Sequence, residues 1–319
     1  RMGAVMAVAA LLAGVNITSV NAAAIIIDDV NNSGYATGQT GGTSWSYLYN
    51  YGNPGNKKAL DRSASTGYYS KNPLTGVAIG HNTKIQETQD NTYYSGVAIG
   101  DYAQATGGLA FALGNYAQST KPSAMALGTA SLSSGFNSLA MMRQSAATGN
   151  FSTAIGTTSW AKGTGSFAMG YSAQAYGDQS IAIGAAEPIT VAGSGTEPSA
   201  SYNGDTNTVT NGARSLAFGT KARTSAAAID SMAFGSNSAN AAATDAFAFG
   251  NTAQATGANA IAMGRTAQAK ELNAIALGGQ AKALEANALA IGGTAEASKA
   301  GTMAIGTAAK ASSNNATAI

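Results

Sequence analysis

The chain has 319 residues, of which 45% are hydrophobic and only 10% are charged, and its formal net charge is +2. The charged fraction is far below the roughly 25% usual for globular domains, which together with 40 glycines is typical of a fibrous extracellular protein. The small net charge argues against a nucleic-acid or membrane-surface partner, and the absence of cysteine excludes disulfides and thiolate metal sites.

Residues 1–24 have the pattern of a secretory signal. Residues 4–15 are apolar over the length of a signal-peptide h-region, and Ala22-Ala23-Ala24 offers the small residues of a cleavage site. The stretch is too short to span a bilayer. We therefore expect secretion across the inner membrane, and a hydrophobic first strand is the alternative interpretation.

Residues 25–75 do not repeat and are rich in tyrosine and glycine. We expect an N-terminal cap here, because the first unit of a repeat stack exposes an unpaired strand edge and an open core. A binding tip is the alternative, and the two roles do not exclude each other.

From residue 76 to residue 319 the chain repeats one phrase, an apolar residue, alanine, an apolar residue and glycine, every 14 residues, as in Val97-Ala98-Ile99-Gly100. A fixed period indicates a repeat architecture. Alternating large and small residues at 260–263, and polar and small residues at 252–256, predict two short strands in each coil. Gly257 and Gly264 are expected to supply positive φ angles at the two corners. Such coils stack into a parallel β-solenoid on the order of 75–80 Å long, with almost no helix.

Two coils are longer than the rest, which predicts insertions near 81–94 and 185–211. The 35 residues from Gly184 to Gly219 are interpreted as two coils plus seven residues. One or two extra residues in each of the next two coils predict small bulges. The single histidine, His81, lies in the first insertion.

The large residues of the first strand are expected to point into the coil, opposite small residues of the second strand such as Ala103 and Ala105, because large against small fills a thin core. The alanine between the large residues would then face outward. An unbroken outward row of small residues predicts close packing against the same row of identical chains, although simple tolerance of alanine is the alternative. The predicted interface residues are Ala98, Ala112, Ala126, Ala140, Ala154, Ala168, Ala182, Ala262, Ala276 and Ala290.

The phrases Asn-Ser-Leu-Ala at 137–140, Asn-Ala-Ile-Ala at 259–262 and Asn-Ala-Leu-Ala-Ile-Gly at 287–292 resemble the YadA-like head repeat of trimeric autotransporter adhesins, the type Vc secretion family. The resemblance implies a left-handed parallel β-roll, an intertwined homotrimer, and display on the outer membrane of a bacterium that attaches to host surfaces. The family's connector, stalk and membrane anchor are absent from residues 1–319. We therefore expect a fragment of a longer fibre, held to the membrane only through a C-terminal anchor outside this chain.

The outward face of the second strand is polar in the C-terminal coils and turns apolar and aromatic between about 102 and 176. Exposed aromatic residues often anchor a protein partner. The predicted receptor-binding residues are Tyr102, Tyr116, Leu132, Trp160, Tyr176 and Tyr202. The alternative is that Trp160 folds over its neighbours or is covered by the second insertion.

No catalytic triad, phosphate-binding loop or regular calcium-binding aspartate occurs, so we expect neither an enzyme nor a cofactor or metal. The expected function is that of an adhesin head that binds a host cell-surface receptor or an extracellular-matrix protein. The alternative is a structural or self-associating spacer of a surface fibre. An ice-binding solenoid needs a regular threonine face, which Lys162, Tyr176 and Leu284 interrupt.

Overall fold

The computed structural model consists of strands and turns, with no helix among the residues it describes. The described residues are 24–27, 60–61, 75–80, 82–86, 95–190, 200–202, 207–236 and 239–319. Nearly all of the predicted signal sequence, most of the predicted cap and His81 lie outside these residues. Within them, no segment forms a helix long and apolar enough to cross a bilayer.

Two long parallel sheets run the length of the molecule, and we call them sheet one and sheet two. Sheet one contains β1 (Ala24–Ile27), β3 (Thr75–Ile79), β5 (Ser95–Ile99), β7 (Phe111–Leu113), β9 (Met125–Leu127), β11 (Leu139–Met141), β13 (Thr153–Ile155), β15 (Phe167–Met169), β17 (Ile181–Ile183), β21 (Leu216–Phe218), β23 (Met232–Phe234), β25 (Phe247–Phe249), β27 (Ile261–Met263), β29 (Ile275–Leu277), β31 (Leu289–Ile291), β33 (Met303–Ile305) and β35 (Thr317–Ala318). Sheet two contains β2 (Leu60–Asp61), β4 (Lys84–Gln86), β6 (Gln104–Ala105), β8 (Gln118–Ser119), β10 (Leu132–Ser133), β12 (Ala146–Ala147), β14 (Trp160–Ala161), β16 (Gln174–Ala175), β20 (Val209–Thr210), β22 (Arg223–Thr224), β24 (Asn240–Ala241), β26 (Gln254–Ala255), β28 (Gln268–Ala269), β30 (Lys282–Ala283), β32 (Glu296–Ala297) and β34 (Lys310–Ala311).

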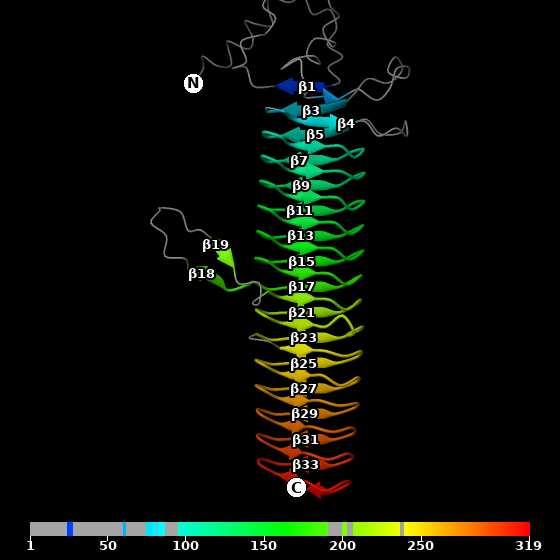
Figure 1. Ribbon diagram of the computed structural model, residues 1–319, viewed down its shortest axis with the longest axis vertical. Coiled ribbons are helices and arrows are strands. Elements are labelled where there is room, and N and C mark those ends of the chain that lie inside the picture. The colour runs from blue at the N-terminus through cyan, green and yellow to red at the C-terminus, as the bar shows by residue number, and fades with distance from the viewer. Residues whose placement is uncertain are drawn as a thin grey trace, which may run out of the picture.

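Each strand pairs with the strand one coil further along, in strict register. In sheet one, Ile261 of β27 lies opposite Ile275 of β29, a separation of one 14-residue period. The coils therefore stack into the straight rod of Figure 1, with the N-terminal strands at one end and β35 at the other. The predicted parallel β-solenoid of 14-residue coils is confirmed, and β26 and β27 lie inside the two predicted strand ranges.

Each coil turns at two tight corners of the same kind. At the corner after β27, the amide of Ala267 donates to the carbonyl of Gly264 at 3.2 Å, and Gly264 has the expected positive φ of 132°. At the other corner the left-handed residue is Asn259, with φ of 55°, whereas Gly257 has no positive φ. Position 257 requires glycine for a different reason, because a Cβ there would lie 2.1 Å from the backbone of Glu271 in the next coil.

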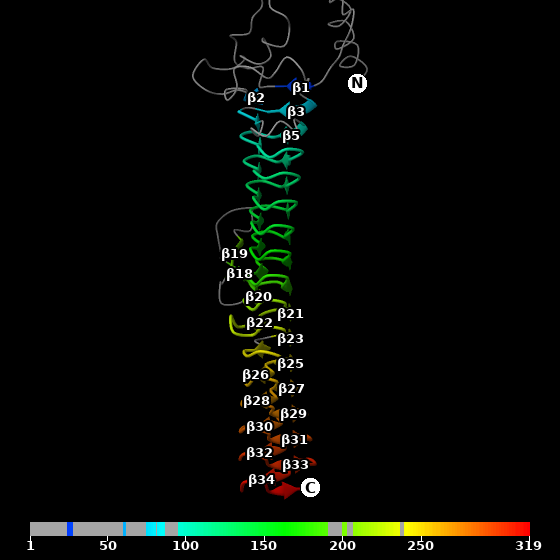
Figure 2. The same cartoon turned by 90° about the vertical axis from the view of Figure 1, so that its right-hand side faces the viewer.

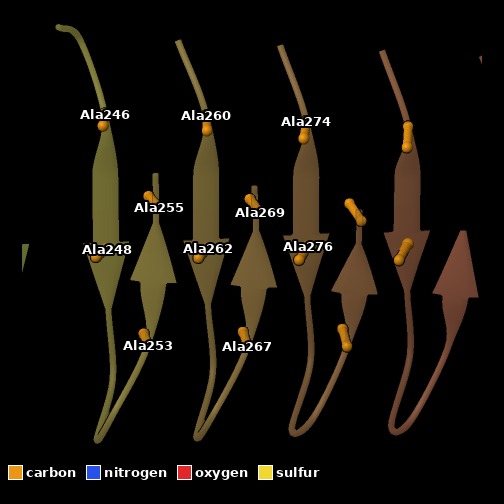
Figure 3. Packing of buried hydrophobic residues seen from close by; sticks show 14 of the residues in the cluster. Ala246, Ala248, Ala253, Ala255, Ala260, Ala262, Ala267, Ala269, Ala274 and Ala276 are labelled. Carbon is orange, nitrogen blue, oxygen red and sulfur yellow. The ribbon is translucent and has the colours of Figure 1, made fainter. Parts of the chain in front are cut away.

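The core contradicts the predicted orientation of the first strand. Ala262 is fully buried between the sheets, while Met263 beside it is 42% exposed on the outside. Both strands point their small residues inward, so the core is a double stack of alanine, serine and threonine methyl and hydroxyl groups. Figure 3 shows the alanines of successive coils repeating along both sheets. Apart from Ile85, which is buried opposite Gly96 in the first described coils, no large side chain of the described residues lies between the sheets. The expected packing of the first strand's large residues against small residues is therefore wrong.

The lengthened coils also differ from the prediction in one respect. β17 pairs directly with β21, so the residues from Gly184 to Gly219 contain one coil and not two. The remaining residues leave the stack at a corner and form the antiparallel hairpin of β18 (Pro188–Thr190) and β19 (Ala200–Tyr202). Farther along, the two residues that lengthen the coil between Gly219 and Gly235 fall in the turn between β22 and β23, where we expected a bulge in a strand.

Candidate functional site

The outward face of sheet one is an exposed apolar surface that runs through the described coils. It is built from the large residues on either side of the buried alanines, with Thr153 as the one polar residue beside Ala154, and we call it the apolar ladder. Leu113 and Met263 are 48% and 42% exposed on this face. The ladder comprises Val97, Ile99, Phe111, Leu113, Met125, Leu127, Leu139, Met141, Ile155, Phe167, Met169, Ile181, Ile183, Leu216, Phe218, Met232, Phe234, Phe247, Phe249, Ile261, Met263, Ile275, Leu277, Leu289, Ile291, Met303 and Ile305.

Strict register brings like side chains of the apolar ladder into contact from coil to coil. The rings of Phe218 and Phe234 stack at 4.7 Å between centroids, and those of Phe234 and Phe249 at 5.2 Å. A soluble monomer rarely exposes a continuous apolar surface of this extent. The apolar ladder is therefore the face of the chain that would gain most from burial against another protein surface.

The alanines predicted to form the interface lie elsewhere. From Ala98 to Ala290 their side chains are fully buried inside the coil of their own chain, with no exposed surface. A second chain has nothing to contact at these positions. The row of small residues is thus explained by the close approach of the two sheets, and the prediction that it faces outward is wrong.

The outward face of sheet two carries the predicted receptor-binding residues in part. Leu132, Ala146, Trp160 and Gln174 follow one another in register on successive coils, so they form one column along the rod. Tyr102 and Tyr116 lie apart from this column at a corner, where both have φ of 59°. The structure therefore does not gather all the predicted residues at one place.

The aromatic residues of this face contact one another from coil to coil. The rings of Tyr102 and Tyr116 stack at 4.9 Å with an interplanar angle of 3°. Trp160 contacts Tyr176 edge to face at 5.5 Å, and its Nε1 donates to Thr148 Oγ1 at 3.4 Å. Trp160 thus leans on its neighbours, as the alternative interpretation supposed, and still exposes 39% of its surface.

The hairpin of β18 and β19 leaves the rod beside β20, on the side of sheet two (Figure 2). An ion pair at its base joins Lys221 Nζ to Glu187 Oε2 at 3.0 Å. The hairpin places the backbone of Tyr202 away from the apolar ladder. Whether Tyr202 binds a receptor stays a prediction.

The structure also shows exposed apolar residues that the sequence reasoning missed. Phe136 and Phe151 are 41% and 57% exposed and meet edge to face at the other corner. Leu109 is exposed at the same corner of an earlier coil. Leu109 and Phe151 occupy the coil position that Asn259 and its equivalents occupy in the C-terminal coils. The replacement of asparagine by a large apolar residue at this position could have indicated the exposed residues from the sequence.

Charged groups on the described surface are few and mostly separate. The clearest pair is Arg214 and Asp230, which meet in two hydrogen bonds of 2.7 Å between neighbouring coils. The hydrogen bonds from Arg214 lower the pKa of the Asp230 carboxyl below its ordinary value. Among the described residues, no three His, Cys, Asp or Glu side chains converge as metal ligands would.

Comparison with known families identifies the repeat. The family described as YadA head domain repeat (2 copies) matches more than half of the chain, over residues 94–117, 133–159, 147–170, 161–186, 211–238, 241–267, 269–295 and 297–319. A search of curated proteins gave no match. The matched segments coincide with the stacked coils whose outer faces are described above. The chain therefore belongs to the YadA head domain family, the heads of surface-displayed trimeric autotransporter adhesins.

Proposed function

We propose that this chain forms the head of a homotrimer that attaches a bacterium to a host cell-surface receptor or an extracellular-matrix protein. Membership of the YadA head family supports a role as a surface adhesin. The observation that carries the trimer is the contrast between the two outer faces of the roll: sheet one presents the apolar ladder, whereas sheet two presents mainly Gln, Thr, Lys and Glu with a few aromatic residues.

The apolar ladder is the surface that joins the three chains in this proposal. Because its side chains repeat on each coil, three parallel rods can bury it along their full length around a common axis. The interface is thus assigned to residues such as Leu113, Phe234 and Met263 in place of the buried alanines. Sheet two and the hairpin then face away from the axis, toward a partner.

The attachment surface is assigned to the exposed aromatic residues of sheet two and to the hairpin, with Trp160 and Tyr202 as its representatives. Trp160 lies within a coil where it is accessible from outside the proposed trimer. Tyr202 belongs to β19, in the hairpin that leaves the stack of coils at a corner. In this proposal the chain is secreted through a signal sequence and is displayed on the cell surface through a C-terminal anchor.

The test is attachment by the purified protein. Beads coated with the trimer are expected to bind cultured host cells or matrix-coated wells, and Trp160→Ala or Tyr202→Ala trimers of unchanged thermal stability are expected to bind less. Leu272→Ala, which truncates an exposed apolar side chain at a corner far from both, serves as the control. If the beads clump together and attach to no host surface, the adhesive function is refuted and the spacer function takes its place.

A further inference from the structure

The coils that carry the aromatic residues of sheet two also differ in charge from the rest of the chain. From residue 102 to residue 177 the sequence contains three basic residues, Lys121, Arg143 and Lys162, and no aspartate or glutamate. The chain as a whole is nearly balanced, with 17 basic and 15 acidic residues. The one-sided charge is thus a local property of this segment.

One basic residue of this segment lies on the outer face of sheet two, and the other two lie at corners that join the two sheets. Lys162 follows directly on β14 and points outward two residues after Trp160, where it is exposed. Arg143 and Lys121 are exposed at the two opposite corners of earlier coils. The aromatic column therefore lies between one corner that carries Arg143 and an opposite corner that carries Lys121 and, beside Tyr176, the exposed Asp178, on the face that the proposed trimer leaves open.

Trp160 and Tyr176 form a small aromatic platform. The two rings meet edge to face at 5.5 Å, and Trp160 Nε1 donates a hydrogen bond to Thr148. The side chain of Gln174 stands beside Trp160 in the next coil. The platform thus combines one open aromatic surface with amide and hydroxyl groups that both donate and accept hydrogen bonds.

We propose that this platform binds an acidic polysaccharide of the host surface. The face of an aromatic ring is electron-rich, so it attracts the positively polarised C–H groups on the flat side of a sugar ring. Gln174 and Thr148 match sugar hydroxyls, and Lys162 pairs with a carboxylate or sulfate. The inference rests on the proposed adhesive function, because it names the chemical class of the partner.

The layout of the segment suits a chain-like ligand better than a compact one. From the coil of Tyr102 to that of Tyr176 the register advances by five coils, which is about 24 Å at the usual strand spacing of about 4.8 Å. Between the aromatic residues, Leu132 and Ala146 give the outer face of sheet two an apolar surface without large protruding side chains. In this proposal a polysaccharide lying along the rod contacts the platform and Lys162 together, and reaches Arg143 in an earlier coil.

Binding is measured in solution through the fluorescence of Trp160. Of the two tryptophans only Trp160 remains in a Trp45→Phe background, and the probes are hyaluronan, heparin and dextran. We expect a saturable fluorescence change with at least one of the two acidic polysaccharides and none with neutral dextran. Binding is expected to weaken as salt is raised, because the exposed charges are screened.

Variants separate the contributions of the ring and the charge. Trp160→Ala is expected to weaken binding about tenfold or more, measured as the amount of labelled polysaccharide that the protein retains. Lys162→Gln is expected to weaken binding about two- to fivefold. Lys282→Gln replaces an exposed lysine on the same sheet far from the platform and is expected to leave binding unchanged. Equal losses in Lys162→Gln and Lys282→Gln overturn the assignment, as does tighter binding of single-stranded DNA than of either acidic polysaccharide.

Attachment to cells distinguishes failure of this inference from failure of the proposed function. Host cells treated with glycosidases that remove acidic polysaccharides are expected to lose most of their capacity to bind the coated beads. If the beads attach equally well to treated cells and Trp160→Ala still reduces attachment, the polysaccharide is refuted while the adhesive function stands. If the beads attach to neither treated nor untreated cells, the adhesive function itself fails.

Discussion

Met263→Lys tests the proposed role of the apolar ladder most directly. Met263 lies on the outward face of β27 and is 42% exposed in the single chain. Fully burying a methionine side chain contributes about 1.5–3 kcal/mol, so covering the exposed part in a trimer contributes about 1 kcal/mol per chain. Lysine loses this gain at three positions and adds a buried, unpaired charge whose cost is larger still. We expect a cost of at least about 3 kcal/mol per trimer, on the order of a hundredfold in the assembly constant.

Two further substitutions separate assembly from folding. Gln254→Lys places the same charge on the outer face of sheet two and is expected to leave the trimer intact. Ala262→Leu adds carbon atoms between the sheets, where Ala262 is fully buried, and overpacking of this kind costs about 1–3 kcal/mol or more. It is expected to lower the unfolding temperature at every protein concentration.

Sedimentation velocity over a range of concentrations gives the mass of each variant, and circular dichroism gives its thermal stability. We expect Met263→Lys to dissociate at concentrations at which the parent protein and Gln254→Lys remain trimeric. A Met263→Lys protein that keeps the parent's oligomeric state over the whole range contradicts the assignment of the apolar ladder. An Ala262→Leu protein of unchanged stability contradicts the thin core.

The remaining predictions concern single coils. Met142 occupies a corner position with φ of 87°, and Met142→Gly is expected to raise stability by about 1 kcal/mol in thermal unfolding because it relieves backbone strain. Gly163→Ala places a Cβ 2.0 Å from the backbone of the next coil, whereas Gly279→Ala meets nothing within 4 Å, so only the first is expected to lower the unfolding temperature. Because the hydrogen bonds from Arg214 lower the pKa of Asp230, the pair stabilises the fold above the unfolded-state pKa of about 3.9 and loses this effect as the pH falls through the folded pKa. An NMR titration is expected to show a higher pKa for Asp230 in Arg214→Gln.

The architecture was predictable because its causes are local and periodic. Glycines spaced 14 residues apart, as from Gly250 to Gly264 to Gly278, fix the coil length. Short alternating segments between them indicate strands, and identical segments in register stack in parallel. The aromatic residues of sheet two were found for the same reason, since alternation places Trp160 on the opposite side of its strand from the buried Ala161.

The direction in which each strand faces was not predictable from alternation alone. Alternation defines two sides of a strand, but the side that is buried depends on the distance between the sheets. One feature of the sequence does indicate which side is buried. A small residue lies three positions after the first residue of each corner, as Ser159 does after Gly156 and Ser152 after Gly149. Ser159 Oγ donates to the carbonyl of Gly156 at 2.8 Å, and Ser152 Oγ to that of Gly149 at 2.7 Å. Both serines are buried and belong to the same inner side as the alanines, so both strands present small residues to the core.

In the proposed trimer, a thin core would link assembly to folding. A core of alanine and serine buries little apolar surface in each coil, at about 0.8 kcal/mol for each buried methyl or methylene group. The larger apolar side chains, such as Phe234 and Met263, do not fit between the sheets and remain on the outer face. We infer that a single rod relies mainly on its backbone ladders and gains most of its apolar stabilisation only when the ladders of three chains meet. The same exclusion of large side chains from the core leaves the opposite face free to vary, so a single coil can carry a tryptophan such as Trp160 without disturbing the stack.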